Sequence, residues 1–257
     1  MPNWVYNELT IEKLNDESLS TEEILSQICS TEENGEKTFD FNKIIPMPES
    51  LGIEDGSKTL GAMRIYLYYH MGYFSIEQLE TIRNRMESWW VEKFNKDSGL
   101  TIQDLVEDLT AYDNVTLDEL MRLGEVAVNN LLTYGSYAWY GWCCNNWGTK
   151  WNACQTMIND NLIYFETAWS PPMPVIEQLS RMFPNNKFTF TYAEEQLSEY
   201  AGKGVFINGE LSFEDYSNDS KKCFETAFRL LGCEPQDYGY EYDEELGTYK
   251  YINDSED

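Results

Sequence analysis

Hydrophobic and polar residues alternate along several stretches of the chain, and this period of two predicts β-strands. The first stretch covers residues 4–13, where Val5, Leu9 and Ile11 share one side and Trp4 lies on the other. One apolar side and one mixed side are typical of a strand with one buried face. Further strands are expected at 39–45, 157–169, 188–192 and 202–210.

Other stretches repeat their apolar residues every three or four positions, which predicts amphipathic helices. Ser20 or Thr21 is a suitable N-cap for a helix that follows directly. Residues 59–134 contain several such repeats and no proline, and Thr116 with Glu119 forms a capping-box pattern. Two later helices are expected around 175–182 and 218–231.

The order of these elements predicts an α+β fold. Strand–helix–strand units stand on either side of the long helical block, which favours one antiparallel sheet interrupted by an insertion. We therefore expect a discontinuous α+β domain at 1–58 and 135–257, and a helical insertion at 59–134. The length of 257 residues is enough for two such parts.

Three sequence motifs resemble one known family. They are MPNWVYNELTI at the N-terminus, FDFNKIIPMPESL at 39–51, and NNWGTKWNA followed by FETAWSPPMPVIEQLS at 165–180. Together they are similar to the YubB-like family of plasmid- and phage-borne proteins. The resemblance covers about the first fifty residues and roughly 140 to 210, and omits the helical block.

This resemblance implies a ferredoxin-like antiparallel sheet with helices on one face, carried by a mobile element in a bacterial host. It implies no established activity and no catalytic residues. Two positions depart from the family pattern: Val5 stands where relatives often have cysteine, and Asn152 where aspartate is common.

Charge excludes several functions. The chain has 45 acidic and 18 basic side chains, a formal net charge of −27. A phosphate backbone or an anionic membrane would repel such a surface, so no direct contact with either is expected. The N-terminus lacks a basic region followed by an apolar one, which predicts no secretory signal and a cytoplasmic location. The six cysteines, irregularly spaced, are then expected to be reduced.

Catalytic and metal-binding patterns are missing from the sequence. His70 is the single histidine, so a Cys/His zinc site lacks its usual ligands. No nucleophile-elbow, zinc-protease or phosphate-loop motif is present. We therefore predict a protein that is not an enzyme and needs no cofactor or metal.

The acidic residues are clustered. Asp104, Glu107 and Asp108 are spaced to share one helix face, where like charges repel. A predicted hairpin at 238–251 alternates tyrosines and carries an acidic tip. The residues expected to contact a partner are Asp104, Glu107, Asp108, Asp118, Glu119, Glu244 and Glu245, with Trp89 or Trp90 as an aromatic anchor.

These features lead to a first hypothesis: a non-enzymatic, acidic inhibitor from a mobile element. Its partner would be a basic host protein that handles nucleic acid, such as a CRISPR or restriction nuclease, and its surface would imitate the charge of DNA or RNA. The oligomeric state is not predicted.

Two alternatives remain open. One is a small-ligand or catalytic domain, although core packing is the favoured role for its tryptophans. The residues of that possible pocket are Trp142, Trp147, Lys150, Trp151 and Trp169. The other is a structural or regulatory protein whose charge only keeps it soluble.

Overall fold

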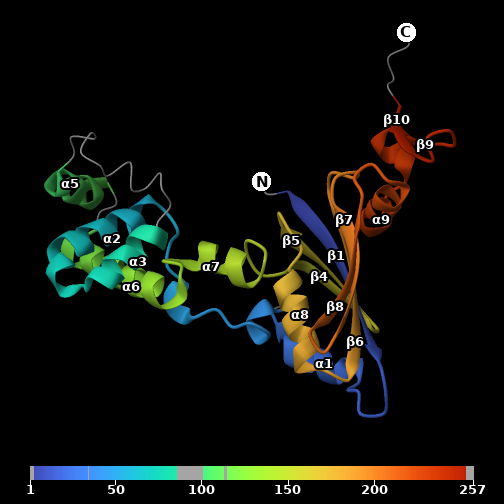
Figure 1. Cartoon of the computed structure of the whole chain (residues 1–257), viewed down its shortest axis with the longest axis horizontal. Helices are drawn as coiled ribbons and strands as arrows, with labels where there is room; N and C mark the ends of the chain where they lie inside the picture. The colour runs from blue at the N-terminus through green and yellow to red at the C-terminus, as the bar shows by residue number, and fades with distance from the viewer. Residues whose placement is uncertain (1–2, 34, 86–100, 113–114, 253–257) are drawn as a thin grey trace, which may run out of the picture. The chain divides into compact units, whose positions relative to one another are not determined.

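In a computed structural model of the chain, residues 3–33, 35–85, 101–112 and 115–252 are described (Figure 1). Trp89 and Trp90, the expected anchors, lie outside the described residues. The chain divides into a sheet unit, Met1–Pro46 with Cys144–Asp257, and a helical unit, Met47–Cys143. The sequence placed these boundaries at 58 and 135.

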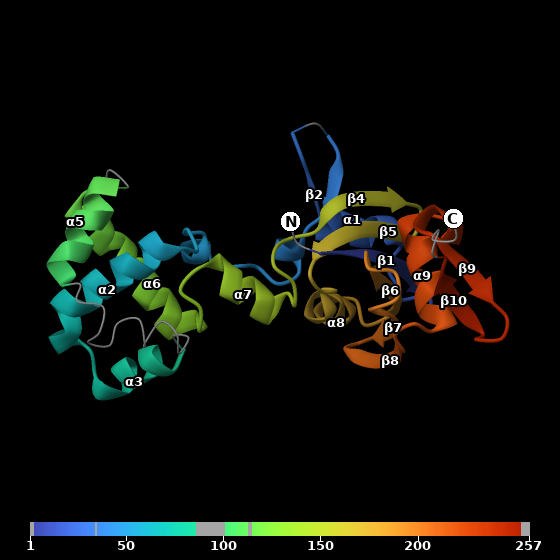
Figure 2. The same ribbon diagram turned by 90° about the horizontal axis from the view of Figure 1, so that it is seen from above.

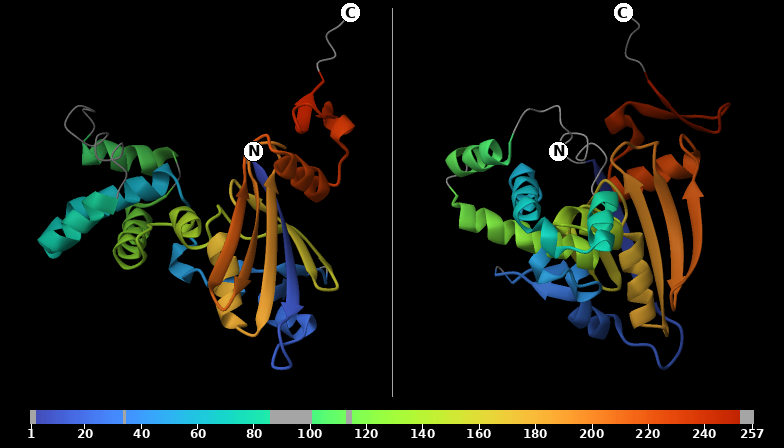
Figure 3. Two further views of the ribbon diagram at one scale, coloured as in Figure 1. Left: turned by 45° about the vertical axis from the view of Figure 1, so that its right-hand side comes forward. Right: turned by 60° about the vertical axis from the view of Figure 1, so that its left-hand side comes forward.

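A six-stranded sheet forms the centre of the sheet unit, and all its neighbouring strands pair antiparallel. Its strand order is β4-β5-β1-β6-β7-β8 (Figure 3). The strands are β1 (Trp4–Lys13), β4 (Cys154–Asn159), β5 (Leu162–Ala168), β6 (Asn186–Glu194), β7 (Ala201–Ile207) and β8 (Glu210–Tyr216).

The order of elements within this unit confirms the predicted fold class. Along the chain, β1, α1 (Thr21–Ile28), β4, β5, α8 (Met173–Met182) and β6 give the β-α-β-β-α-β order of a ferredoxin-like fold. Their four strands lie side by side as β6-β1-β5-β4. The helical unit is inserted between α1 and β4, and β7 and β8 extend the sheet.

Strict alternation along β1 separates the two faces of the sheet. Val5, Asn7, Leu9 and Ile11 are buried on one face, as the pattern predicted apart from the polar Asn7. Aromatic rings fill the core on this face, where Phe39 and Phe41 from the N-terminal segment meet Phe165, and Phe165 meets Phe190. Buried apolar side chains of α1 and α8 also line the core.

One helix departs from the expected arrangement of helices on a single face. Helix α9 (Lys221–Leu231) packs Phe224 and Phe228 against Ala193 and Ala201 of β6 and β7. These alanines alternate with the core-facing aromatics, so α9 covers part of the opposite face (Figure 2).

Two turns define the ends of strands that the period-two pattern predicted, and the first of them was missed. The stretch at 157–169 is a pair of strands, because Asp160, with a φ of 51°, reverses the chain between β4 and β5. At the end of β7, Asn208 and Gly209 both have positive φ and form a two-residue turn into β8. The sheet unit also contains two short hairpins, one formed by β2 (Cys29–Thr31) and β3 (Lys37–Phe39) and the other by β9 (Tyr240–Asp243) and β10 (Thr248–Tyr251).

The helical unit is built around one close helix crossing. Gly124 of α6 (Leu117–Tyr134) packs on α2 (Ser57–His70) so tightly that a Cβ there would lie 2.2 Å from the carbonyl oxygen of Ala62. Small buried clusters on both helices complete the core, with Met63 and Val128 in one and Ile65 and Leu120 in the other. The remaining described helices are α3 (Ile76–Arg85), α5 (Ile102–Tyr112) and α7 (Trp139–Asn146).

Among the residues described, none of the helices combines the length and apolar character needed to cross a bilayer. The six cysteines are free thiols, and Cys143 and Cys223 are buried.

Candidate functional site

The predicted C-terminal hairpin is present and is attached to α9 by aromatic rings. Strands β9 and β10 pair antiparallel with Tyr242 opposite Tyr249. On the α9 side, the rings of Tyr240 and Tyr249 lie 5.0 and 5.5 Å from the ring of Phe224. The hairpin therefore has an ordered base, which positions its acidic tip.

Asp243 shapes this tip and takes part in its internal contacts. Its carboxylate accepts backbone N–H groups of Glu245 and Leu246 at 2.9 and 3.1 Å, and lies 2.9 Å from Lys250 Nζ. The hydrogen bond from Lys250, followed by that from Leu246, lowers the pKa of Asp243. Glu244 and Glu245 are exposed beside Leu246, whose side chain is 65% exposed. The tip thus presents two carboxylates next to an apolar side chain.

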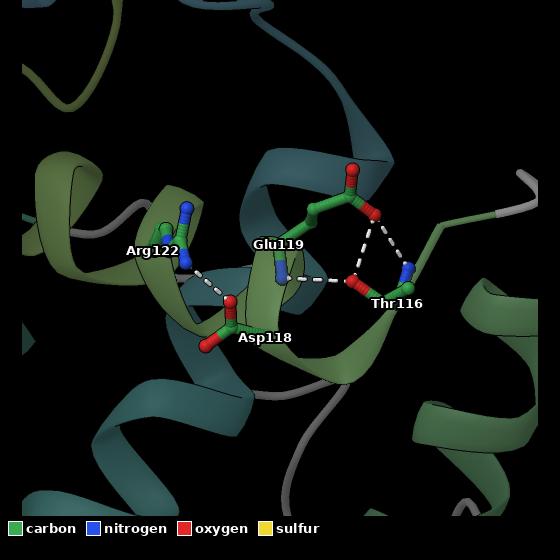
Figure 4. Close-up of polar contacts among 4 residues, drawn as sticks. All are labelled: Thr116, Asp118, Glu119 and Arg122. Carbon is green, nitrogen blue, oxygen red and sulfur yellow. Dashed lines mark hydrogen bonds and ion pairs between the residues drawn. The ribbon is translucent and has the colours of Figure 1, made fainter.

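Unlike the two exposed carboxylates of the hairpin tip, several acidic residues of the helical unit form hydrogen bonds or ion pairs with neighbouring residues (Figure 4). The carboxylate of Glu119 accepts hydrogen bonds from the backbone N–H and hydroxyl of Thr116 at 2.7 and 2.8 Å, completing the predicted capping box. Asp104 makes the same contacts with Thr101 at the start of α5. In each case the backbone hydrogen bond, then the hydroxyl, lowers the pKa of the carboxyl group.

These caps correct one inference from the sequence. The cluster of Asp104, Glu107 and Asp108 was interpreted as unfavourable for stability, but Asp104 lies in the first helical turn, where a carboxylate is stabilising. Asp118 forms an i,i+4 ion pair with Arg122 at 2.6 Å. Glu107 and Asp108 are exposed on α5. Three of the five acidic candidates in this unit thus have a local structural partner.

The five residues of the possible pocket divide between the two units. Trp142 is buried in the helical unit, whereas Trp147, Lys150, Trp151 and Trp169 belong to the sheet unit. Trp147 is a core residue whose Nε1 donates to the carbonyl oxygen of Ile45 at 2.9 Å.

Lys150 contacts two indole rings of this set. Its Nζ lies 4.6 Å from the ring centroids of both Trp151 and Trp169, a cation–π arrangement. Trp151 also approaches Trp4, with ring centroids 6.2 Å apart. One face of each of these two indole rings is therefore in contact with the chain's own ammonium group.

Asn152, the position that departs from the family pattern, joins two of the sequence motifs. Its Nδ2 donates to Asp40 at 2.8 Å, and its Oδ1 accepts the backbone N–H of Phe41 at 2.8 Å. Burial alone would raise the pKa of Asp40, but hydrogen bonds from Ser30, Asn152 and the Asn42 backbone lower it. An asparagine suits this position because an aspartate could not donate to Asp40.

A carboxyl group that the sequence did not single out lies on the outer face of the sheet. Glu166 on β5 pairs across strands with Tyr6 of β1 and Cys154 of β4. Partial burial, and then the negative charge of Glu195, raise the pKa of Glu166. The pKa of Tyr6 is also raised, first by burial and then by the charges of Glu166 and Glu195. The proximity of Glu166, Tyr6 and Cys154 follows only from the strand register, because these residues are far apart in sequence.

Within the described ranges, no group of three or more histidine, cysteine, aspartate or glutamate side chains has an arrangement that could hold a metal ion.

A protein-family model supports the fold of the sheet unit. Residues 146–251 match a family model described as a ferredoxin-like domain in Api92-like protein. The chain is also similar to the crystal structure of a protein api92 from Yersinia pseudotuberculosis, with 11% sequence identity and a TM-score of 0.37. That alignment covers 84% of this chain and 99% of the other. No curated protein matches the sequence.

The family match lies entirely within the sheet unit. It includes β5 and β6, which flank β1, but β1 itself precedes the matched residues. This stretch is thus similar to the ferredoxin-like domain of Api92-like proteins, and the finer resemblance to YubB-like proteins stays a prediction.

Proposed function

We propose that this protein is a non-enzymatic interaction protein that binds and inhibits a basic, nucleic-acid-handling host protein. The observation that carries the proposal is the net charge of −27 together with an ordered hairpin whose Glu244 and Glu245 are exposed. Among the described contacts, no side-chain partner is found for either carboxylate. Such a surface attracts a cationic groove and steers association over long range.

The finer parts of this proposal come from the family resemblance. A protein carried by a plasmid or phage in the bacterial cytoplasm would act on a defence nuclease of the CRISPR or restriction type. The contact surface consists of the hairpin tip, with Glu107 and Asp108 of the helical unit as a second acidic group. No direct contact with nucleic acid or membrane is part of the proposal.

The hairpin contribution is tested with a matched pair of double variants. Glu244→Gln with Glu245→Gln removes two charges from the tip, and Glu32→Gln with Glu33→Gln removes two exposed charges elsewhere in the sheet unit. The intact chain and both variants are immobilised, and bacterial lysate is applied at roughly 0.05 and 0.5 M salt, between which screening increases strongly. Duplex DNA is then added as a competitor.

We expect basic nucleic-acid-binding proteins to be retained at low salt, released at high salt and displaced by duplex DNA. The hairpin variant should retain markedly less of them than the control variant. Retention that ignores both salt and DNA would contradict the proposal. Equal losses in the two variants would show that total charge, and not the hairpin, is responsible.

A second candidate function is a ligand site at Glu166, which lies across from Tyr6 and Cys154; Cys154 in turn contacts Trp151. The observation favouring it is the raised pKa of this carboxyl group on a partly covered face of the sheet. It ranks second because Lys150 already occupies a face of Trp151. Titration with tetramethylammonium, followed by tryptophan fluorescence, tests it: a saturable change that Glu166→Gln abolishes would support a cation site, and no change would exclude one for this probe.

A further inference from the structure

The two edges of the six-stranded sheet differ in how they are protected. At one edge, β4 has a register shift between Cys154 and Met157, and Thr156 Oγ1 accepts the backbone N–H of Phe39 next to it. A bulge and a covering segment are the usual means of preventing further strand pairing. The β4 edge is thus protected.

Strand β8 forms the other edge and lacks these features (Figure 3). Its pairing with β7 runs without a register shift from Glu210 to Tyr216. Six of its seven residues are exposed, and Leu211 and Phe213 are 45% and 38% exposed. Within the described part of the chain, no element pairs with its outer side. Its sequence, ELSFEDY, contains neither lysine nor proline, the residues that commonly protect an edge.

The turn before β8 determines which backbone groups face outward. A two-residue turn makes its flanking residues, Ile207 and Glu210, a hydrogen-bonded pair. Alternation then directs the N–H and C=O groups of Ser212 and Glu214 toward β7. The groups of Leu211, Phe213 and Asp215 therefore point away from the sheet, ready to pair with another strand.

Charge restricts what this edge can accept. Glu210, Glu214 and Asp215 give β8 three carboxylates and no basic residue. Among the described residues, Glu214 forms an ion pair with Lys222 Nζ at 2.6 Å, whereas Asp215 accepts a hydrogen bond from the neutral hydroxyl of Tyr192. A second copy of the chain, also with a net charge of −27, would place the same three carboxylates against this edge, and the two would repel.

We propose that β8 pairs with an extended, lysine- or arginine-rich segment of the basic partner, which adds a seventh strand to the sheet. Strand addition of this kind gains affinity from main-chain hydrogen bonds and specificity from alternate side chains. This inference rests on the proposed function, because it assumes that the partner is basic. It adds a contact at the sheet edge to the contact proposed for the hairpin tip.

The test uses a seven-residue peptide of alternating lysine and valine. A control peptide has proline in place of the central valine, which keeps the charge but disrupts strand pairing. Binding to the intact chain is measured by fluorescence anisotropy, and amide hydrogen exchange is measured with each peptide. We expect the proline peptide to bind at least about tenfold more weakly, the loss of one or two net hydrogen bonds.

Hydrogen exchange provides an internal control for the register. The alternating peptide should slow exchange at the amides of Leu211, Phe213 and Asp215, and leave Ser212 and Glu214 little changed because they already pair with β7. Leu211→Pro, which removes an outward N–H, should abolish that protection, whereas Leu211→Ala should keep it. The wild-type exchange pattern alone decides the question if the proline variant does not fold.

Three outcomes would overturn the inference. Equal binding of both peptides would mean attraction by charge alone, and the proposed function would stand without strand addition. Protection confined to other strands would place the contact elsewhere. A concentration-dependent dimer that Leu211→Pro abolishes would make a second copy the occupant. Failure of the proposed function is separate, because it would appear as lysate binding that ignores salt and DNA.

Discussion

The acidic residues expected to contact a partner have different surroundings in the two units. In the helical unit, Asp104 and Glu119 cap helices and Asp118 pairs with Arg122. In the sheet unit, Glu244 and Glu245 are exposed at a tip that Asp243 shapes for them. The candidates at a helix N-terminus or beside a basic side chain thus have a structural partner, whereas the two at the hairpin tip have none among the described side chains.

The two units also differ in their net negative charge. The 45 acidic and 18 basic side chains divide into 30 and 11 in the sheet unit and 15 and 7 in the helical unit. The larger excess belongs to the unit with the hairpin and the open edge of β8. Partner binding is thus expected to depend more on the sheet unit than on the helical insertion.

The units also differ in what stabilises them. The sheet unit is held by contacts between segments far apart in the chain, such as Asn152 with Asp40 and Phe165 with Phe39. The helical unit depends on the close crossing of α2 and α6 at Gly124. A single methyl group at this crossing should therefore affect one unit and spare the other.

The largest expected effect is that of Gly124→Ala. Its Cβ would clash with the Ala62 backbone, and we expect the helical unit to lose about 3 kcal/mol of stability, the upper part of the usual range for overpacking. Circular dichroism during thermal unfolding should show an early loss of helix with the sheet unit retained. Gly72→Ala, which adds a methyl group in open space, is the control. Simultaneous unfolding of both parts would show that the units are not independent.

The next effect tests the sheet unit. Asn152→Asp would place a second carboxylate against Asp40 and remove its donor, at a cost of about 2 kcal/mol near neutral pH. The cost should shrink as the pH falls, because protonation of either carboxyl restores a donor. In the wild type, Asp40 has a lowered pKa, so its contribution is present above the unfolded pKa and is lost as pH falls through the folded value.

Urea unfolding of this variant across a pH series measures both effects. Asn159→Asp, an exposed change of the same kind, serves as the control. A stability difference that stays constant down to acid pH would contradict the assigned contact between residues 152 and 40.

A smaller effect separates the two kinds of acidic residue directly. Thr116→Ala removes the cap of α6 and should lower the stability of the helical unit by about 1 kcal/mol. Glu244→Gln with Glu245→Gln should leave the stability of both units unchanged, because neither carboxylate has a described side-chain partner. Thermal unfolding monitored by circular dichroism compares the three proteins. A stability loss in the hairpin variant would assign those carboxylates a structural role.

The smallest effect concerns Glu166. Its pKa is raised in the folded state, so the carboxyl lowers stability as pH rises from the unfolded value through the folded one. Glu166→Gln should therefore raise stability at neutral pH by less than about 1 kcal/mol, since solvent reaches the group, and the gain should vanish in acid. Chemical unfolding at neutral and acid pH measures the difference. A variant that is less stable at neutral pH would show that the ionised carboxylate has a stabilising partner.

Much of the local structure was predictable because its signals lie close together in sequence. Alternating apolar residues predicted β1 and its buried side, and the capping box at Thr116 and Glu119 predicted the start of α6. Alternating tyrosines predicted the C-terminal hairpin. Turns were harder to predict, since Asp160 lies within an otherwise strand-like run. Its missed turn merged β4 with β5, whereas β8, which follows the glycine turn at the end of β7, was not predicted as a strand.

The sequence by itself determined the charge, the α+β fold class and the absence of known catalytic motifs, because composition and short-range periodicity carry this information. Only the tertiary structure decided which carboxylates cap helices, which indoles contact Lys150, and which sheet edge is open. Strand register and helix crossings bring together residues that are remote in the chain, so no local pattern specifies these contacts.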